Sequence, residues 1–82
     1  MKSYNIYSSV YSNGDGWFIE IVNNWEEQVF ESWLYYEGYG VKTYMFGMSY
    51  NDVSFEKFKM LVLTQYQDYT GDYFDEVMMK NV

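Results

Sequence analysis

Apolar and polar residues alternate in two short stretches near the start of the chain, residues 4–11 and residues 17–22. Successive side chains of a β-strand point to opposite sides, so both stretches predict strands. Between them lies the pair Asn13-Gly14, and both of these residues accept the positive φ angles of a tight hairpin turn. We therefore expect a β-hairpin in this part of the chain.

The next segment has its large apolar residues three or four positions apart, which is the spacing of one helix face. Asn24 can serve as an N-cap residue, and Glu27 three positions later completes a capping-box pattern. Gly38 suits the left-handed position that often follows a helix. These signals predict a helix from about residue 24 to residue 37. Its apolar stripe contains Trp25, Val29, Trp33 and Tyr36, with Phe30 and Leu34 beside them.

The second half of the chain predicts one more strand and one or two more helices. Residues 41–50 are rich in Tyr, Phe, Met and Thr, which favours a strand, and Gly47 would mark a bulge in it. Ser54 and Gly71 suit the two ends of a helix. A short third helix is expected over residues 73–79.

These elements give the order ββαβαα and an α+β fold, in which two to three helices cover one face of a small antiparallel sheet of about three strands. A chain of 82 residues forms a single domain, residues 1–82. Aromatic residues make up 24% of it. Each buried aromatic ring removes about 150–250 Å² from water, so a few rings can build the core of so small a domain.

Missing residue types exclude several kinds of chemistry. The chain has no Cys, His or Arg, so it lacks a thiol nucleophile, a base that titrates near neutral pH and a bidentate phosphate clamp. We expect neither enzymatic activity nor a cofactor. No apolar run reaches the roughly 18–20 residues that a membrane span needs, and no secretory signal pattern follows Met1. A cytoplasmic location is therefore expected.

Acidic residues are numerous and unbalanced. Twelve acidic residues stand against five lysines, which gives a net charge of −7, and no basic residue occurs between Ser3 and Val41. A surface of this sign repels phosphates and anionic lipid, so direct binding to nucleic acid or membrane is not expected. Two interpretations stay open: the charge keeps an aromatic-rich protein soluble, or it forms a patch that fits a basic partner.

The second interpretation supplies candidate binding residues. On the predicted first helix, Glu27 and Glu31 would lie about 6 Å apart, close to the spacing of phosphates along a nucleic-acid strand. A second group of acids lies between residues 68 and 76, and its spacing departs from a calcium-binding loop, so we assign no metal site to it. The residues assigned to partner binding are Asp15, Glu20, Glu27, Glu31, Tyr35, Glu37, Asp68, Asp72, Asp75 and Glu76. The tyrosines expected at the surface are Tyr7, Tyr11, Tyr35, Tyr39 and Tyr73.

In size, charge and expected architecture the chain resembles small acidic inhibitors of phages and mobile elements, such as DNA-mimicking anti-CRISPR proteins, anti-restriction proteins and uracil-DNA glycosylase inhibitors. The resemblance implies stoichiometric occlusion, in which carboxylates occupy the place of phosphates in the basic channel of a host defence nuclease or effector. An immunity-type or antitoxin-type inhibitor of a basic nuclease fits the same electrostatics. A structural protein that oligomerises through aromatic surface is a third interpretation. The target and the oligomeric state stay open.

Overall fold

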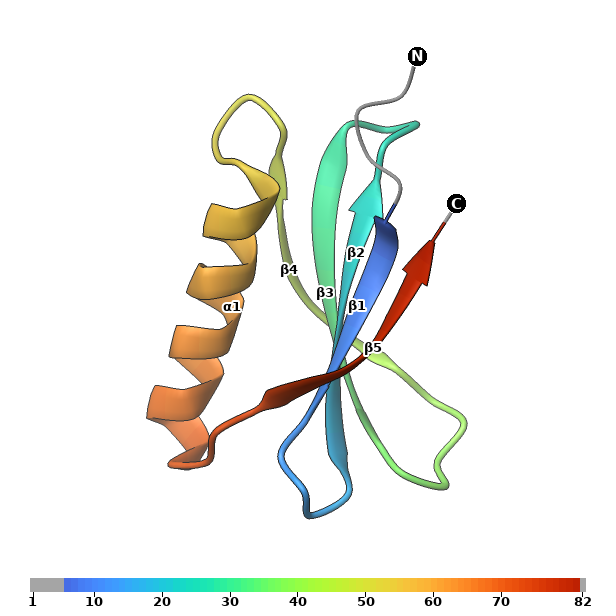
Figure 1. Cartoon of the computed structure of the whole chain (residues 1–82), viewed down its shortest axis with the longest axis vertical. Helices are drawn as coiled ribbons and strands as arrows, with labels where there is room; N and C mark the ends of the chain where they lie inside the picture. The colour runs from blue at the N-terminus through green and yellow to red at the C-terminus, as the bar shows by residue number, and fades with distance from the viewer. Residues whose placement is uncertain (1–5, 82) are drawn as a thin grey trace.

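Five antiparallel strands form one sheet, and one helix lies across it (Figure 1). The computed structural model describes residues 6–81. The order of the strands across the sheet is β4-β3-β2-β1-β5. The elements are β1 (Ile6–Ser12), β2 (Trp17–Asn24), β3 (Val29–Tyr36), β4 (Thr43–Ser49), α1 (Phe55–Thr70) and β5 (Asp75–Asn81).

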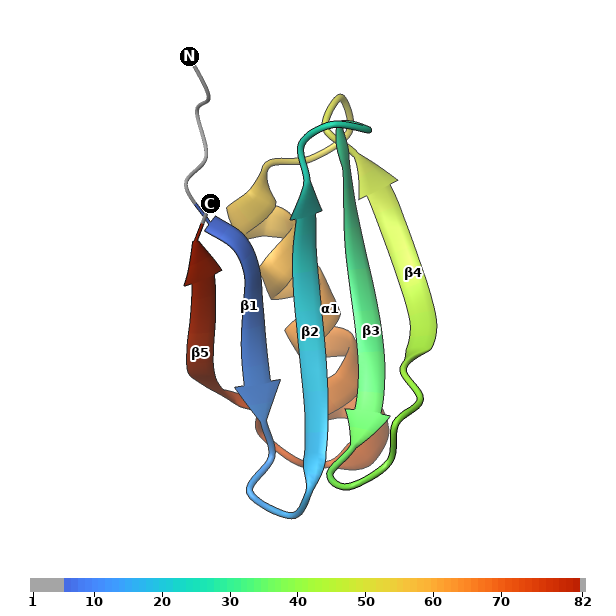
Figure 2. The same ribbon diagram turned by 90° about the vertical axis from the view of Figure 1, so that its right-hand side faces the viewer.

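The first four strands form a meander of consecutive hairpins, and β5 returns to the opposite edge of the sheet, beside β1. The helix α1 connects these two edges and covers one face of the sheet (Figures 1 and 2). Figure 2 shows the other face, which we call the open face, turned toward the viewer with α1 behind the strands. Within residues 6–81, no helix is long and apolar enough to cross a membrane.

The predicted hairpin at the start of the chain is confirmed. Strand β1 pairs with β2 over five residue pairs, from Ser8 with Val22 to Ser12 with Phe18. Asn13 closes the turn, because its Oδ1 accepts hydrogen bonds from the backbone N–H groups of Asp15, at 2.8 Å, and Trp17, at 3.1 Å. The local turn chemistry was therefore enough to predict this pairing.

The predicted helix over residues 24–37 is wrong, because the structure has a turn followed by β3 there. Asn24 does accept a hydrogen bond from the Glu27 N–H, at 3.2 Å, as a helix cap would. However, Gln28 takes a φ of 58°, and a left-handed residue ends a helical turn and reverses the chain. From Val29 onward the alternate side chains pair in register with β2 and β4, which a helix would not permit.

The predicted third helix over residues 73–79 is also wrong, because residues 75–81 form β5. The sheet therefore has five strands instead of about three, and there is one helix instead of two or three, although the fold remains α+β. The strand expected over residues 41–50 is confirmed as β4, but its bulge falls between Tyr44 and Phe46 and not at Gly47.

The predicted helix that begins after Ser54 is confirmed as α1. The Ser54 Oγ accepts a hydrogen bond from the Lys57 N–H, at 3.1 Å, and Gly71 ends the helix in a left-handed conformation. Its buried residues Phe55, Phe58 and Val62 recur at three- and four-residue intervals, which places them on one face. They pack against the aromatic and aliphatic side chains of β2 and β3 to form the core.

Tyr11 supplies the polar contact between the core and β5. It is 5% exposed, and its hydroxyl donates a hydrogen bond to Glu76 Oε1 at 3.1 Å. Burial raises the pKa of Tyr11 to about 12; the hydrogen bond to the Glu76 carboxylate adds to that rise, while a contact with Ser9 opposes it. The neutral phenol is therefore the form that the folded protein favours.

A pH dependence follows from the raised pKa of Tyr11. The pKa of Tyr11 is higher in the folded state than in the unfolded state. The protonated Tyr11 phenol therefore stabilises the folded protein below pH 10, and this contribution is lost as the pH rises through 12. We expect the wild-type protein to lose about 2 kcal/mol more stability than Tyr11→Phe across this range. Urea unfolding at pH 9, 11 and 12, followed by circular dichroism, measures the difference. Parallel losses in the two proteins would contradict the expectation.

Candidate functional site

Three connecting segments meet at one end of the sheet, because alternate connections of a meander lie at the same end. They are the β1–β2 turn of residues 13–16, the β3–β4 loop of residues 37–42 and the α1–β5 connection of residues 71–74 (Figures 1 and 2). The β2–β3 turn of residues 25–28 and the β4–α1 loop lie at the opposite end. Acidic residues from both halves of the sequence are thereby brought together.

The β1–β2 turn contacts both of its neighbours at this end. The Gly16 carbonyl oxygen accepts a hydrogen bond from the Glu37 N–H at 2.7 Å, which joins the turn to the β3–β4 loop. On its other side, Asn13 Nδ2 donates to Asp72 Oδ2 at 3.3 Å, which joins it to the α1–β5 connection. The three segments therefore form one continuous surface.

Three of the ten predicted binding residues lie in these segments and three lie next to them on α1 and β5, and we call the surface that the six form the acidic end. All six are exposed: Asp15, Glu37, Asp68, Asp72, Asp75 and Glu76. Asp68 lies in the last turn of α1, where the helix macrodipole is negative and a carboxylate lowers helix stability. The C-terminus of α1 therefore adds to the negative potential of the acidic end.

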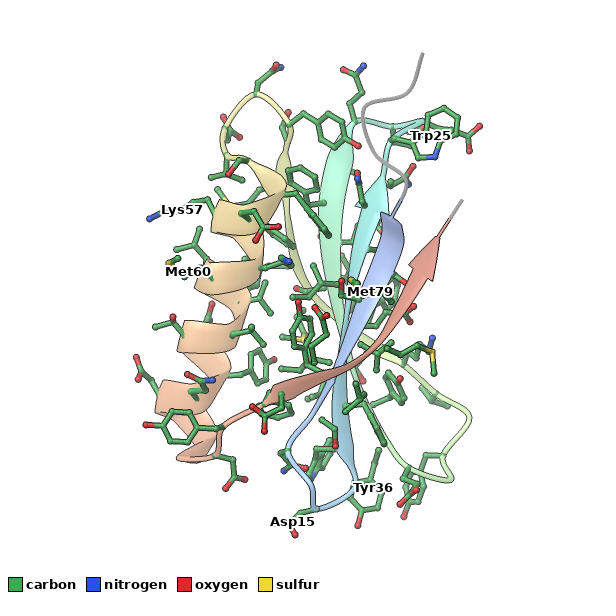
Figure 3. The ribbon with its side chains drawn as sticks, in the orientation of Figure 1. Asp15, Trp25, Tyr36, Lys57, Met60 and Met79 are labelled. Atoms are coloured by element: carbon green, nitrogen blue, oxygen red, sulfur yellow. The ribbon has the colours of Figure 1, made fainter. Side chains whose placement is uncertain are left out.

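The lysines whose side chains the structure describes are Lys42, Lys57 and Lys59. Lys42 is in the β3–β4 loop, but its Nζ lies 2.5 Å from Glu20 Oε1 and so its charge is used on the open face. Lys57 and Lys59 are in the first half of α1, and Lys59 Nζ pairs with Glu56 at 3.1 Å. Figure 3 shows Asp15 at the acidic end and Lys57 toward the other end of the molecule.

The other four predicted residues lie elsewhere. Glu27 is exposed in the β2–β3 turn at the opposite end, so it shares no helix face with Glu31. Glu20 is only 7% exposed and is bound to Lys42. Glu31 is half-buried on β3 and accepts a hydrogen bond from Trp33 Nε1 at 3.4 Å. The patch expected on one helix is therefore replaced by a surface made of loops and of the adjoining ends of α1 and β5.

Tyr35, the fourth of these residues, belongs to the open face. Its ring stacks on Phe18 with ring centroids 5.3 Å apart, and Lys42 Nζ lies 5.0 Å from the Tyr35 centroid. Burial raises the pKa of Tyr35, and the Glu20 carboxylate raises it further while Lys42 opposes the rise. These contacts hold Tyr35 in place on the sheet.

The tyrosines expected at the surface divide in the structure. Tyr39 and Tyr73 are exposed, at 74% and 77%, which confirms the expectation for them. Tyr11 is buried in the core and Tyr35 is half-buried, so the expectation was wrong for Tyr11 and only partly right for Tyr35. The side chain of Tyr7 lies outside the described part of the structure.

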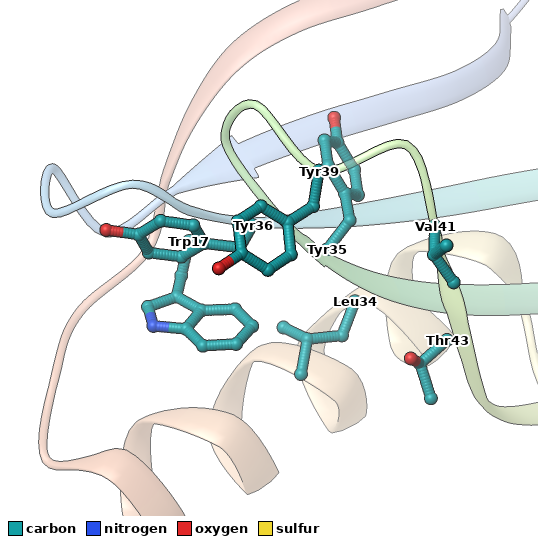
Figure 4. Close-up of a pocket in the computed structure, with 7 residues that line it drawn as sticks. All are labelled: Trp17, Leu34, Tyr35, Tyr36, Tyr39, Val41 and Thr43. Carbon is teal, nitrogen blue, oxygen red and sulfur yellow. The ribbon is translucent and has the colours of Figure 1, made fainter.

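An aromatic hollow of about 620 Å³ adjoins the acidic end, and no pattern in the sequence predicted it (Figure 4). Two pairs of aromatic rings make edge-to-face contacts. The ring centroids of Trp17 and Tyr36 are 5.0 Å apart with an interplanar angle of 71°, and those of Tyr36 and Tyr39 are 5.7 Å apart with an angle of 76°. The residues that line the hollow are Trp17, Leu34, Tyr35, Tyr36, Tyr39, Val41 and Thr43. They come from the three strands β2, β3 and β4 and from the β3–β4 loop, so no spacing pattern along the chain marks them.

Gly16 ties the hollow to the acidic end. Its φ of 94° suits glycine, and a Cβ at this position would lie 2.9 Å from the Tyr36 ring. The absence of a side chain therefore allows the ring to lie directly on the β1–β2 turn, beside Asp15. Figure 3 shows Asp15 and Tyr36 at the same end of the molecule.

This arrangement is suited to binding a positively charged surface. Among the described residues, no group of three or more acidic side chains is placed so that it could hold a metal ion. The exposed carboxylates and rings instead offer charge and amphipathic contact area. Comparisons with family models, with curated proteins and with solved structures found no match to this chain.

Proposed function

We propose that this protein binds, through its acidic end, a basic nucleic-acid-binding surface of another protein and blocks access of the nucleic acid to it. The observation that supports the proposal is the gathering of exposed carboxylates from three hydrogen-bonded segments at one end, whereas Lys57 lies toward the other end (Figure 3). The partner would be a nuclease or effector, as in the anti-CRISPR and anti-restriction inhibitors that the chain resembles, or in an immunity pair. Such a partner places the protein in the cytoplasm.

The electrostatics of the acidic end suit this role. Carboxylates of one sign on one surface create a potential that speeds encounter with a Lys/Arg-lined groove, and salt weakens that attraction. The placement of Asp68 at the C-terminus of α1 lowers helix stability, so stability alone does not account for it. Hydrogen bonds between the three segments also hold the surface in shape, which reduces the entropy lost on binding.

A specific observation favours self-association as a second candidate. Strand β5 lies at one edge of the sheet, and three consecutive apolar residues on it are about half exposed: Val77, Met78 and Met79. An edge strand of this kind can pair with another chain. Salt separates the candidates, because apolar pairing persists at high salt whereas binding through carboxylates weakens.

The proposal predicts that charge reversal matters at one end of the molecule only. We expect Asp15→Lys/Glu37→Lys to lower the capture of nucleic-acid-binding proteins from a bacterial lysate at least tenfold at low salt. The matched control is Glu26→Lys/Glu27→Lys in the exposed β2–β3 turn, which changes the net charge by the same amount. The control variant should capture as the parent does. DNA binding by a captured protein, followed by fluorescence anisotropy, should fall on addition of one equivalent of the parent.

Two results would contradict the proposal. Equal loss of capture in both variants would mean that net charge alone governs binding. Undiminished capture by the Asp15→Lys/Glu37→Lys variant would mean that the acidic end is not the contact surface. Association that persists at high salt and involves only copies of this chain would favour pairing through β5.

A further inference from the structure

We infer that the aromatic hollow receives an arginine side chain of the basic partner. This inference rests on the proposed function and names the side chain that the acidic end recognises. It is carried by two features that lie together: a hollow with aromatic walls, and exposed carboxylates beside it. Neither feature alone would select a cation that is both planar and partly apolar.

The walls of the hollow suit a cation. Trp17, Tyr36 and Tyr39 meet at 71° and 76°, so their ring faces point in different directions around the space (Figure 4). The face of an aromatic ring carries negative electrostatic potential and attracts a cation placed over it. Leu34 forms an apolar surface that suits the methylene stem of a long side chain.

Carboxylates flank these rings along the chain. Glu37 follows Tyr36 directly, and Asp15 precedes Gly16, on which the Tyr36 ring rests. Both carboxylates are exposed, so they can accept hydrogen bonds from an incoming donor. A hollow that served a neutral side chain would gain nothing from acidic residues next to its aromatic residues in the chain.

The protein's own nearby lysine is not among the residues that line the hollow. Lys42 follows Val41, which lines the hollow, but its ammonium group bonds to Glu20 and lies over Tyr35 on the open face. The hollow is therefore open to a cation from another molecule. Figure 4 shows Val41 and Thr43 on the side of the hollow opposite the Trp17 and Tyr36 rings.

Arginine fits this combination better than lysine does. Its guanidinium group is planar and weakly hydrated, so it stacks on aromatic rings and also donates paired hydrogen bonds to a carboxylate. The ammonium group of lysine is compact and strongly hydrated, which makes its transfer into an aromatic hollow less favourable. Arginine is also abundant on surfaces that bind nucleic acid, which agrees with the proposed partner.

The test uses two short peptides and the full chain. Acetyl-Gly-Arg-Gly-amide carries the guanidinium, and acetyl-Gly-citrulline-Gly-amide is its neutral counterpart of nearly equal shape. In an NMR titration we expect the arginine peptide to shift the Trp17 indole and the Tyr36 and Tyr39 ring resonances in a saturable manner. The citrulline peptide should bind at least tenfold more weakly.

Two matched tyrosine variants test whether the arginine peptide binds in the hollow. Tyr39→Ala should weaken binding of the arginine peptide at least threefold, whereas Tyr73→Ala should leave it unchanged. The two tyrosines are similarly exposed, at 74% and 77%, but Tyr73 lies outside the hollow. Equal shifts from the citrulline peptide would overturn the inference, since they would mean that any side chain of this shape is accepted. Shifts of the Asp15 and Glu37 amides without shifts of the rings would overturn it as well.

The inference and the proposed function can fail separately. If the Asp15→Lys/Glu37→Lys variant loses its partner but the arginine peptide leaves the rings unmoved, the proposed function stands and the inference falls. If the arginine peptide binds the rings but capture does not depend on the acidic end, the proposed function falls and the hollow remains an arginine site. If Tyr39→Ala lowers capture of the partner and Tyr73→Ala does not, both stand.

Discussion

Replacement of Phe30 by alanine is expected to lower the free energy of unfolding by about 3–5 kcal/mol, because the change leaves a cavity where three rings meet. Phe30 is 1% exposed, and its ring centroid lies 4.6 Å from that of Tyr50, 5.3 Å from Phe55 and 5.6 Å from Phe58. A domain of this length has a total stability of roughly 4–12 kcal/mol. The expected loss is therefore a large fraction of the total stability and should move the unfolding transition to much lower urea.

Phe18→Ala is the matched control for this prediction. Phe18 is also a phenylalanine and lies on the central strand β2, but it is half-buried on the open face, where its ring stacks on that of Tyr35. Its loss should cost about 1 kcal/mol. Urea unfolding followed by circular dichroism measures both variants. Similar losses would show that α1 does not cover the face to which Phe30 belongs.

Replacement of Gly47 by valine is expected to cost about 3 kcal/mol, the upper end for a side chain forced into filled space. A Cβ at Gly47 would lie 2.6 Å from the Phe30 carbonyl oxygen and 2.6 Å from the Tyr44 hydroxyl. The tyrosine can rotate away, but the carbonyl belongs to the backbone of β3, so the strands themselves would have to separate. The valine side chain favours strands, and this preference offsets only part of the cost.

Gly40→Val provides the comparison for Gly47→Val. Gly40 lies in the β3–β4 loop, and no heavy atom beyond its two chain neighbours lies within 4 Å of the position that its Cβ would take. We expect the free energy of unfolding of Gly40→Val, measured in urea, to stay within about 0.5 kcal/mol of that of the parent. A Gly47→Val protein as stable as Gly40→Val would mean that β3 and β4 are not in the register described.

Local signals predicted the elements whose ends are marked by the chain itself. Asn13-Gly14 predicted the first hairpin, and Ser54 with Gly71 predicted the limits of α1. In each case the decisive hydrogen bonds join residues only a few positions apart, such as the Ser54 Oγ with the Lys57 N–H. These contacts form in the same way whatever the rest of the chain does.

The error over residues 24–37 arose because both faces of β3 carry large apolar side chains. Phe30 and Leu34 point toward the helix side of the sheet, whereas Trp33 and Tyr35 belong to the open face. Rings on both faces hide the alternation of a strand and mimic the spacing of a helix stripe. Pairing with β2 and β4 decides the conformation, and β4 lies well beyond this segment in the sequence.

The candidate site depended on contacts that are still more distant along the chain. The sequence marked two groups of acids, and the antiparallel topology placed Asp15 and Glu37 from one with Asp72 from the other at one end. The hollow was not predictable, because Trp17 and Tyr39 come together only when β2 and β3 pair and the loop after β3 turns back.

The pairing of Ile6 with Asn81 brings the first and last described residues next to each other, at the end of the sheet opposite the carboxylate-rich loops. A surface anchored near Ile6 or Asn81 would therefore leave the binding loops directed into solution. The same adjacency suits circular permutation: a short linker could join the termini, with new ones opened in the turn of residues 25–28. Such a permuted chain would keep every loop of the binding end uncut.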